Sequence, residues 1–370
     1  MGIKGLSQFL DNKGISTARW DVNRLRNNRI AIDANNLCCN RMNGVVRQVI
    51  DNWPLSLSIP TSQDYTQPLI LAVVKYLLRI MNYQCTPIMV FDGKAPSEKA
   101  NAQSSRRDRL ALKRDELHKI KSIMMEHYNK NEVPPEDLIA QYRKLQTSYI
   151  LPSKECYNEL VIALQHLGIP AIRAIGEGDP LCASLVRDGY CVAALSSDRD
   201  LLVYGCPILI ASFNISSDGY LDKVYYLEHI LEGLRYSFDE FVTWCIMCGC
   251  DYNTNIRGKA AGRAYEYIKS GGDPKEIEGS EVLNFDECRF LFQYRPSNEL
   301  IDADQVDLNI SNTYDEEDSY IHKYNLETEV AAVSSARMLQ DRINIYEYYD
   351  PSNPQRLKGP ISSHADTPQE

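Results

Sequence analysis

Short apolar runs alternate with longer segments of helical periodicity along most of the chain. Three of these runs end in aspartate, and they cover residues 29–34, 87–93 and 193–202. A short apolar run bounded by polar residues is typical of a buried strand, and strands that alternate with helices favour a parallel sheet. The pattern therefore predicts an α/β fold with a mixed, mostly parallel central sheet flanked by helices.

The same periodicity predicts the elements around this sheet. Helices are expected over residues 2–10, 36–50, 68–81, 153–167, 177–188, 238–248 and 262–270, and further strands over 171–174 and 206–213. The proline-containing residues 51–66 predict a loop. After residue 271 the pattern weakens, and the prolines among the last twenty residues predict a disordered tail.

Two more helices, over residues 98–128 and 136–149, have a different character. The first has charged side chains on most of its faces and only a thin apolar stripe to meet a core, and the second is polar as well. A helix of this kind is usually exposed to solvent or becomes buried only when a partner binds.

Composition and charge narrow the class of protein. A chain of 370 residues with 44% hydrophobic and 24% charged content is typical of a soluble globular protein, and we expect no membrane span. Its eleven cysteines are best interpreted as reduced thiols, which predicts an intracellular, reducing compartment. The net charge of -10 argues mildly against nucleic acid, but residues 98–121 carry eight Lys and Arg against four Asp and Glu. Such a local basic stripe is what a phosphate backbone would meet.

Seven acidic residues stand at predicted strand ends or helix starts: Asp33, Asp92, Glu177, Asp179, Asp198, Asp200 and Asp251. Each alone could serve as a helix cap, as Asp179 before Pro180 suggests. Together, at one edge of a parallel sheet, they would form a pocket that favours Mg²⁺ or Mn²⁺. Two such ions can support phosphodiester hydrolysis. With six histidines in the chain and none in these motifs, a zinc hydrolase or a histidine base is disfavoured.

Five motifs, in order along the chain, resemble those of the XPG/flap endonuclease superfamily. They are Met1-Gly2-Ile3-Lys4-Gly5-Leu6, Ala31-Ile32-Asp33-Ala34, Val90-Phe91-Asp92-Gly93-Lys94, Ser197-Asp198-Arg199-Asp200 and Gly249-Cys250-Asp251-Tyr252. The resemblance implies a PIN-like fold with a helical arch and an appended helix-two-turn-helix motif. It also implies a structure-specific 5′ nuclease that acts on branched DNA with two Mg²⁺ ions, which Mn²⁺ can replace.

The resemblance also divides the chain into regions. It implies an N-terminal nuclease region (residues 1–97), a basic helical gateway or arch (98–152), an internal nuclease region (153–235), a helix-two-turn-helix that binds duplex DNA (236–270), a C-terminal extension (271–348) and the disordered tail (349–370).

Residue roles follow from the same resemblance. Asp33, Asp92, Glu177 and Asp179 would serve one metal ion, and Asp198, Asp200 and Asp251 the other, with Asp198 counted among the catalytic residues. Lys99 would polarise the scissile phosphate, and Arg106 would stabilise the charge of the transition state. The implied DNA contacts are Gly2, Arg41, Arg47, Lys154, Gly258, Lys259, Gly262 and Arg263.

Several positions depart from the family pattern. Glu177-Gly178-Asp179-Pro180 replaces Glu-Ala-Glu-Ala, and Ala260 replaces a glycine at the turn where the family binds K⁺, so that the potassium site stays open. The family's base-stacking aromatic falls near Cys39, and its acidic 3′-flap loop is not evident in residues 51–66. The absence of a sliding-clamp motif and of a basic tail favours a virus-encoded or divergent protein and gives no support to a clamp partner.

The leading hypothesis is a monomeric, Mg²⁺-dependent 5′ flap endonuclease with 5′–3′ exonuclease activity in DNA replication or repair, in the nucleus or at another site of replication. The exonuclease and Holliday-junction resolvase branches of the superfamily are alternatives, and residues 246–251 are more similar to the exonuclease branch. A catalytically dead scaffold that binds nucleic acid is a third alternative. Such proteins lose several metal acids, whereas all seven are present here.

Overall fold

The computed structural model describes residues 2–15, 17–53, 60–302, 328–329 and 332. The predicted tail (349–370), most of the predicted extension beyond residue 302 and the middle of the 51–66 loop lie outside the described residues. Within the described part of the chain, no helix is long and apolar enough to cross a membrane.

A seven-stranded sheet forms the centre of the molecule, in the order β1-β7-β6-β5-β2-β3-β4. The four pairs among β6, β5, β2, β3 and β4 are parallel, whereas β7 is antiparallel to both of its neighbours. The prediction of a mixed, mostly parallel sheet is thus confirmed. The strands are β1 (Ala18–Asp21), β2 (Arg29–Asp33), β3 (Thr86–Phe91), β4 (Ala171–Arg173), β5 (Ala193–Leu195), β6 (Ile208–Ile210) and β7 (Tyr220–Tyr226).

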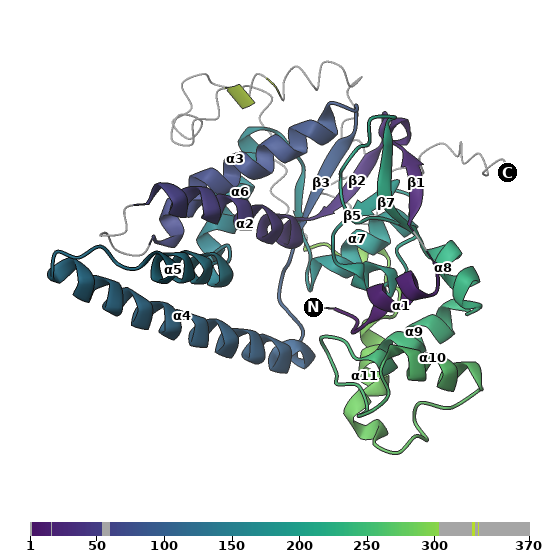
Figure 1. The fold of residues 1–370 in the computed structure, drawn as a ribbon. Helices are drawn as coiled ribbons and strands as arrows, with labels where there is room; N and C mark the ends of the chain where they lie inside the picture. The colour runs from purple at the N-terminus through teal and green to yellow at the C-terminus, as the bar shows by residue number, and fades with distance from the viewer. Residues whose placement is uncertain (1, 16, 54–59, 303–327, 330–331, 333–370) are drawn as a thin grey trace.

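Helices cover both faces of the sheet (Figure 1). Alternation along β2 sends Ile30 and Ile32 into one apolar core and Ala31 into the other. The first core packs against α2 (Ala34–Asn52), α3 (Ser62–Met81) and α6 (Lys154–His166). The second packs against α1 (Leu6–Asn12), α7 (Gly178–Arg187), α8 (Leu227–Leu234), α9 (Phe238–Cys248), α10 (Ala261–Lys269) and α11 (Phe285–Leu291).

Two polar helices, α4 (Ala100–Asn129) and α5 (Glu136–Tyr149), leave the body of the molecule. Figure 1 shows α4 at the lower left, beneath α5, with one end near the N-terminus. The two helices share a small apolar cluster around Leu117, Ile120, Met124 and Tyr142, which is separate from both main cores. The short 3₁₀ helix η2 (Ser97–Lys99) leads from the body into α4.

Several boundaries differ from the predictions for identifiable reasons. The helix predicted over 2–10 begins only at Leu6, because Gly5 has a φ of 74° that cannot belong to a right-handed helix. The helix predicted from Pro68 begins at Ser62, where a capping box of Thr61 and Asp64 starts it. Residues 62–66 of the predicted loop are therefore helical.

Other elements were shorter than predicted or absent from the predictions. The strand expected over 206–213 is limited to Ile208–Ile210, since Pro207 has no N–H to donate to a neighbouring strand. The antiparallel strands β1 and β7 and the helix α8 were not predicted. Residues 271–302, whose pattern is weak, form η4 (Ser280–Leu283), α11 and α12 (Ser297–Leu300). They pack on the second core through Leu283, Cys288 and Phe292.

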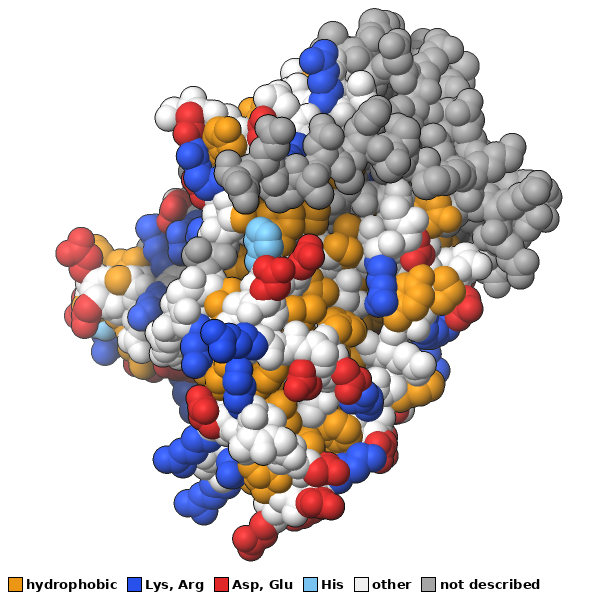
Figure 2. Space-filling view, turned by 90° about the vertical axis from the view of Figure 1, so that its right-hand side faces the viewer, with side chains coloured by type: hydrophobic (Ala, Val, Ile, Leu, Met, Phe, Trp, Pro, Cys, Tyr) orange, Lys and Arg blue, Asp and Glu red, His pale blue; other side chains and the backbone are white. Residues whose placement is uncertain are grey.

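The face on the right-hand side of Figure 1 is seen directly in Figure 2. Lys and Arg, Asp and Glu, and hydrophobic side chains are interspersed on it. This mixture is ordinary for a solvent-facing protein surface.

Candidate active site

Three parallel strands deliver aspartates to one edge of the sheet. β2 ends at Asp33, which is paired in register with Val90 of β3, two residues before Asp92. On the other side of β2, Leu195 of β5 is paired with Ile32, and Asp198 follows three residues later. Because these strands run in the same direction, their carboxyl ends meet at the same edge, where open α/β sheets bind ligands.

The remaining acids reach this edge from helix ends. Glu177 is the N-cap of α7, Asp179 lies in its first turn, and Asp251 follows α9. Asp200 stands in the 3₁₀ helix η3 (Arg199–Leu202). The seven predicted acids thus come together from five separate segments of the chain.

The carboxylates destabilise one another's charged forms. Burial raises the pKa of Asp33 to about 6, and the charge of Asp92 adds to this rise. Burial likewise raises the pKa of Asp179 well above its usual range, with further contributions from Asp33 and Asp198. Asp200 follows the same rule, since burial and then Asp198 raise its pKa. The site is a buried concentration of negative charge that a cation would stabilise.

Backbone and hydroxyl donors hold individual oxygens of these acids. Asp33 accepts from the N–H of Asn36 and from the hydroxyl of Ser196, both at 2.9 Å. Asp92 Oδ1 accepts from the N–H of Gly178 at 2.7 Å. Asp33 therefore ends β2 and also caps α2. The same carboxylate serves as a helix cap and as a member of the acid cluster.

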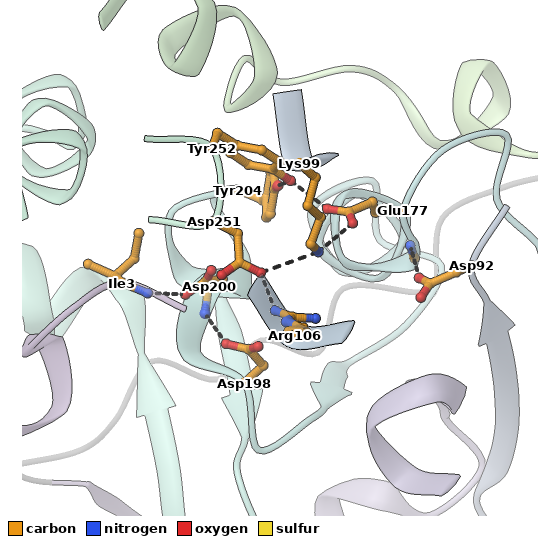
Figure 3. Close-up of polar contacts among 11 residues, drawn as sticks. Ile3, Asp92, Lys99, Arg106, Glu177, Asp198, Asp200, Tyr204, Asp251 and Tyr252 are labelled. Carbon is orange, nitrogen blue, oxygen red and sulfur yellow. Dashed lines mark hydrogen bonds and ion pairs between the residues drawn. The ribbon is translucent and has the colours of Figure 1, made fainter. Parts of the chain in front are cut away.

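Two cations from η2 and α4 occupy part of this negative pocket (Figure 3). Lys99 Nζ pairs with Glu177 Oε1 and lies 3.5 Å from Asp251 Oδ2. Arg106 Nη2 donates to the same Asp251 oxygen at 2.5 Å. Burial lowers the pKa of Lys99, but Glu177 and Asp251 outweigh it and leave the pKa raised. The structure thus joins the first turns of the basic helix to the acids.

The donor set fits a divalent cation such as Mg²⁺ or Mn²⁺. Hard carboxylate oxygens dominate it, and their mutually raised pKa values reflect charge that a bound cation would offset. Among the described residues, no three acidic, His or Cys side chains are arranged to hold a metal ion directly. Glu177 and Asp251 are bonded instead to Lys99 and Arg106.

The N-terminus closes one side of the site. Gly2 has a φ of 108°, and a Cβ atom there would lie 2.5 Å from Asp200 Oδ1 and 2.9 Å from Asp198 Oδ1. The N–H of Ile3 donates to Asp200 Oδ1 at 2.7 Å. Gly2 was predicted as a DNA contact, and the structure places it directly against two of the acids.

A cavity of about 410 Å³ lies beside Asp251. It opens between the N-terminus, the first turns of α4 and the chain that follows α9. Its lining includes Gly2, Lys4, Asn101, Arg109, Asp251 and Asn284. The cavity therefore joins the acid cluster to the basic helix.

The predicted duplex contacts around the α9–α10 connection lie apart from the acids. Gly258 has a φ of 78° and accepts a hydrogen bond from Arg263 Nη1 at 2.9 Å. Lys259 lies over the ring of Tyr267, and Gly262 is in the first turn of α10. Ala260 has a φ of -64°, which any residue adopts, so its backbone conformation does not require glycine.

The other predicted contacts differ in their surroundings. Arg47 on α2 and Lys154 at the start of α6 are exposed. Arg41 is half-buried. Its guanidinium lies 4.7 Å from the ring centre of Tyr76, so that it contacts α3 rather than the acids. Cys39, at the place of the family aromatic, has its sulfur 3.9 Å from the hydroxyl of Tyr157.

Comparison with known proteins shows the family of the chain. Family models for the XPG N-terminal domain and the XPG I-region match residues 1–113 and 168–251. Flap endonuclease 1 of Schizosaccharomyces japonicus is 30% identical over 79% of this chain and 75% of its own length. The chain belongs to the XPG/flap endonuclease family. Flap endonuclease 1 of Theileria parva is 29% identical over 81% of the chain, which spans only 58% of that relative.

A solved structure of the family shows the same fold. Flap endonuclease-1 from Methanococcus jannaschii superposes with a TM-score of 0.59, at 20% identity, over 88% of this chain and 98% of its own. This likeness confirms the PIN-like architecture predicted from the family resemblance.

Several residues that contact the acids were not predicted from the sequence. Ser196 and Asn36 hold Asp33, and Tyr252 donates to Glu177. Tyr252 stands in one of the five motifs, directly after Asp251, and this position was the only available signal. Tyr204, which contacts Tyr252, lies in an apolar stretch that gave none.

Proposed function

We propose that the protein is a Mg²⁺-dependent, structure-specific 5′ flap endonuclease with 5′–3′ exonuclease activity. It would hydrolyse phosphodiester bonds of branched DNA with a 5′ flap and duplex arms during replication or repair. The observation that carries the proposal is the meeting of seven carboxylates with Lys99 and Arg106 at one edge of the sheet. The names of its relatives support the same activity.

The family resemblance divides the acids between two metal ions. Asp33, Asp92, Glu177 and Asp179 would hold one divalent ion, directly or through water, and Asp198, Asp200 and Asp251 the other. When bound, such a pair supplies an activated water and stabilises the leaving oxygen. Ser196, Asn36 and the backbone of Ile3 orient individual carboxylates before any cation arrives.

Lys99 and Arg106 act on the substrate in this proposal. In the structure they neutralise Glu177 and Asp251, so that the acids keep them at the reacting centre. A phosphodiester in the site would offer them a second anionic partner. Lys99 would polarise the scissile phosphate, and Arg106 would stabilise the charge that builds up in the transition state.

The same proposal assigns the remaining regions. Residues 98–152 would form the gateway for the 5′ strand, and residues 236–270 would hold duplex DNA through Gly258, Lys259, Gly262 and Arg263. Gly2, Arg41, Arg47 and Lys154 contribute further DNA contacts. The protein would act as a monomer inside the cell, where DNA is replicated, and a viral origin is compatible with this role.

The decisive experiment compares the wild type with Asp198→Ala on double-flap DNA with Mg²⁺. Wild type should cleave at the base of the 5′ flap, and Asp198→Ala should lose more than about a hundredfold in rate, because a metal ligand is removed. Asp222→Ala is the matched control, since this aspartate is exposed on β7. A wild type that leaves the flap intact across salt and Mg²⁺ concentrations overturns the proposal.

Lys99→Ala tests the substrate role separately. Cleavage should slow by about a hundredfold or more, while the Kd for the same DNA barely changes. Lys119→Ala, an exposed position on α4, should affect the rate little. An equal loss of binding and rate in Lys99→Ala would reduce Lys99 to general phosphate attraction.

A further inference from the structure

Two tyrosines form a hydrogen-bonded chain behind Glu177 (Figure 3). The Tyr252 hydroxyl lies 2.5 Å from Glu177 Oε2, and the Tyr204 hydroxyl lies 2.6 Å from that of Tyr252. The three side chains come from three places: the N-cap of α7, the turn after η3, and the residue after Asp251.

The direction of this chain follows from its chemistry. An ionised carboxylate has no proton to donate, so Tyr252 must give its only hydroxyl proton to Glu177. The oxygen of Tyr252 can then only accept from Tyr204. The proton order is Tyr204 to Tyr252 to Glu177, and each donor in turn strengthens the next.

Packing holds both rings in place. Tyr204 and Tyr252 are only 6% and 8% exposed. Phe292, which follows α11, packs edge-on against both rings at centroid distances of 5.2 and 5.7 Å. A rotation of either ring would collide with Phe292, so the hydroxyls have a fixed position relative to the Glu177 carboxylate.

We infer that Tyr252 is a positioning residue that orients Glu177 for a divalent cation, and that Tyr204 acts through Tyr252. The inference rests on the proposed function, which makes Glu177 a metal ligand. Tyr252 occupies Oε2, and the other oxygen, Oε1, faces the Lys99 ammonium. The tyrosine therefore selects which oxygen of Glu177 is presented to a cation, as partners behind metal ligands commonly do.

The contribution of Tyr204 should be smaller and indirect. Tyr252 can still donate to Glu177 when the Tyr204 hydroxyl is absent, but its oxygen then lacks a donor and the bond to Glu177 weakens. Any effect of Tyr204 on the cation must consequently disappear once the Tyr252 hydroxyl has been removed.

The test uses Mn²⁺ as the probe and the full chain without DNA. Loss of the free-Mn²⁺ signal in electron paramagnetic resonance measures binding. Tyr252→Phe keeps the packed ring and should weaken Mn²⁺ affinity about tenfold to a hundredfold. Tyr204→Phe should weaken it by roughly threefold, and the double variant should match Tyr252→Phe alone.

Two controls separate orientation from general damage. Tyr294→Phe removes another tyrosine hydroxyl that donates to a carboxylate, Asp188, at 2.6 Å, and it should leave Mn²⁺ affinity unchanged. In a Glu177→Ala background, Tyr252→Phe should have no further effect on Mn²⁺. The Kd for flap DNA without metal and the melting temperature should stay near wild type in both single phenylalanine variants.

The outcomes are distinct from those of the proposed function. Unchanged Mn²⁺ affinity in Tyr252→Phe, additive losses in the double variant, or a wild type that binds no Mn²⁺ overturns the inference. A wild type that binds Mn²⁺ with the expected pattern but cleaves no flap DNA overturns the nuclease proposal and leaves the inference standing.

Discussion

At the scale of single residues, the N-terminal glycine shows how closely the chain surrounds its acids. Gly2 has space for a hydrogen but not for a methyl group, because Asp198 and Asp200 fill the position of its missing Cβ atom. The neighbouring Ile3 N–H is at the same time a donor to Asp200. The first described residues are thus part of the acid cluster rather than a loose end.

Gly2→Ala should therefore impair the site. We expect cleavage to slow by roughly a hundredfold, the cost typical of a misplacement of about 1 Å at a reacting centre. Rates on double-flap DNA at saturating Mg²⁺ measure the effect. Gly14→Ala is the control, since Gly14 also has a positive φ, 69°, but has open space around its missing Cβ. Equal losses in both variants would point to backbone strain alone.

The sequence predicted the acids better than the groups that orient them. Asp33, Asp92 and Asp198 follow apolar runs, and such runs reveal strand ends without any knowledge of the tertiary structure. The partners of these acids depend on three-dimensional proximity. Nothing in the spacing of Tyr204 indicates that its hydroxyl reaches Tyr252, forty-eight positions away along the chain.

At the scale of elements, the polar helix α4 has two unequal halves. All of its buried residues lie toward its C-terminal end, at Leu117, Ile120 and Met124. The half that carries Arg106 has no buried residue, and an ion pair with Asp251 connects it to the body. The element most closely tied to the chemistry is consequently held by charge at one end and by a small apolar cluster at the other.

Leu117→Ala should destabilise the packing of α4 against α5 and leave the stability of the central sheet unchanged. Removal of a fully buried leucine costs about 2–5 kcal/mol, and here the loss falls on a cluster separate from the main cores. Amide hydrogen exchange should accelerate across residues 100–149 and stay unchanged in β2. Leu112→Ala, on the same helix but 69% exposed, should leave both regions as in wild type.

The elements also show where periodicity succeeds as a predictor. The helices α5 and α9 have the predicted bounds, 136–149 and 238–248. The strands β1 and β7 were missed because β1 is short and the middle of β7, at Asp222 and Lys223, is exposed and polar. Their pairing with each other depends on contacts between distant parts of the chain.

At the scale of the whole molecule, net charge and local charge favour opposite behaviour toward DNA. The chain carries a net charge of -10, yet residues 98–121 hold twice as many basic as acidic side chains, eight against four. Screening limits electrostatic attraction to about 10 Å at moderate ionic strength. The nearby basic helix should therefore dominate the approach of a phosphate backbone.

DNA affinity should fall steeply with salt despite the acidic total. A plot of log K against log salt for flap DNA, with Ca²⁺ in place of Mg²⁺ to prevent cleavage, should have a clearly negative slope. Arg109→Ala, beside the cavity, should reduce the slope by about one. Arg24→Ala, exposed in the 3₁₀ helix before β2, should leave it unchanged. A flat response in wild type would contradict this account.

The position of Phe292 has a consequence for how the protein is made. Phe292 braces the tyrosines behind Glu177, and Ile301 bridges to Ala174, three residues before that glutamate. A ribosome must therefore release roughly the first three hundred residues before the pocket can close. Asp33 and Asp92 emerge before these partners, so a nascent chain would carry an incomplete site until residue 301 has emerged.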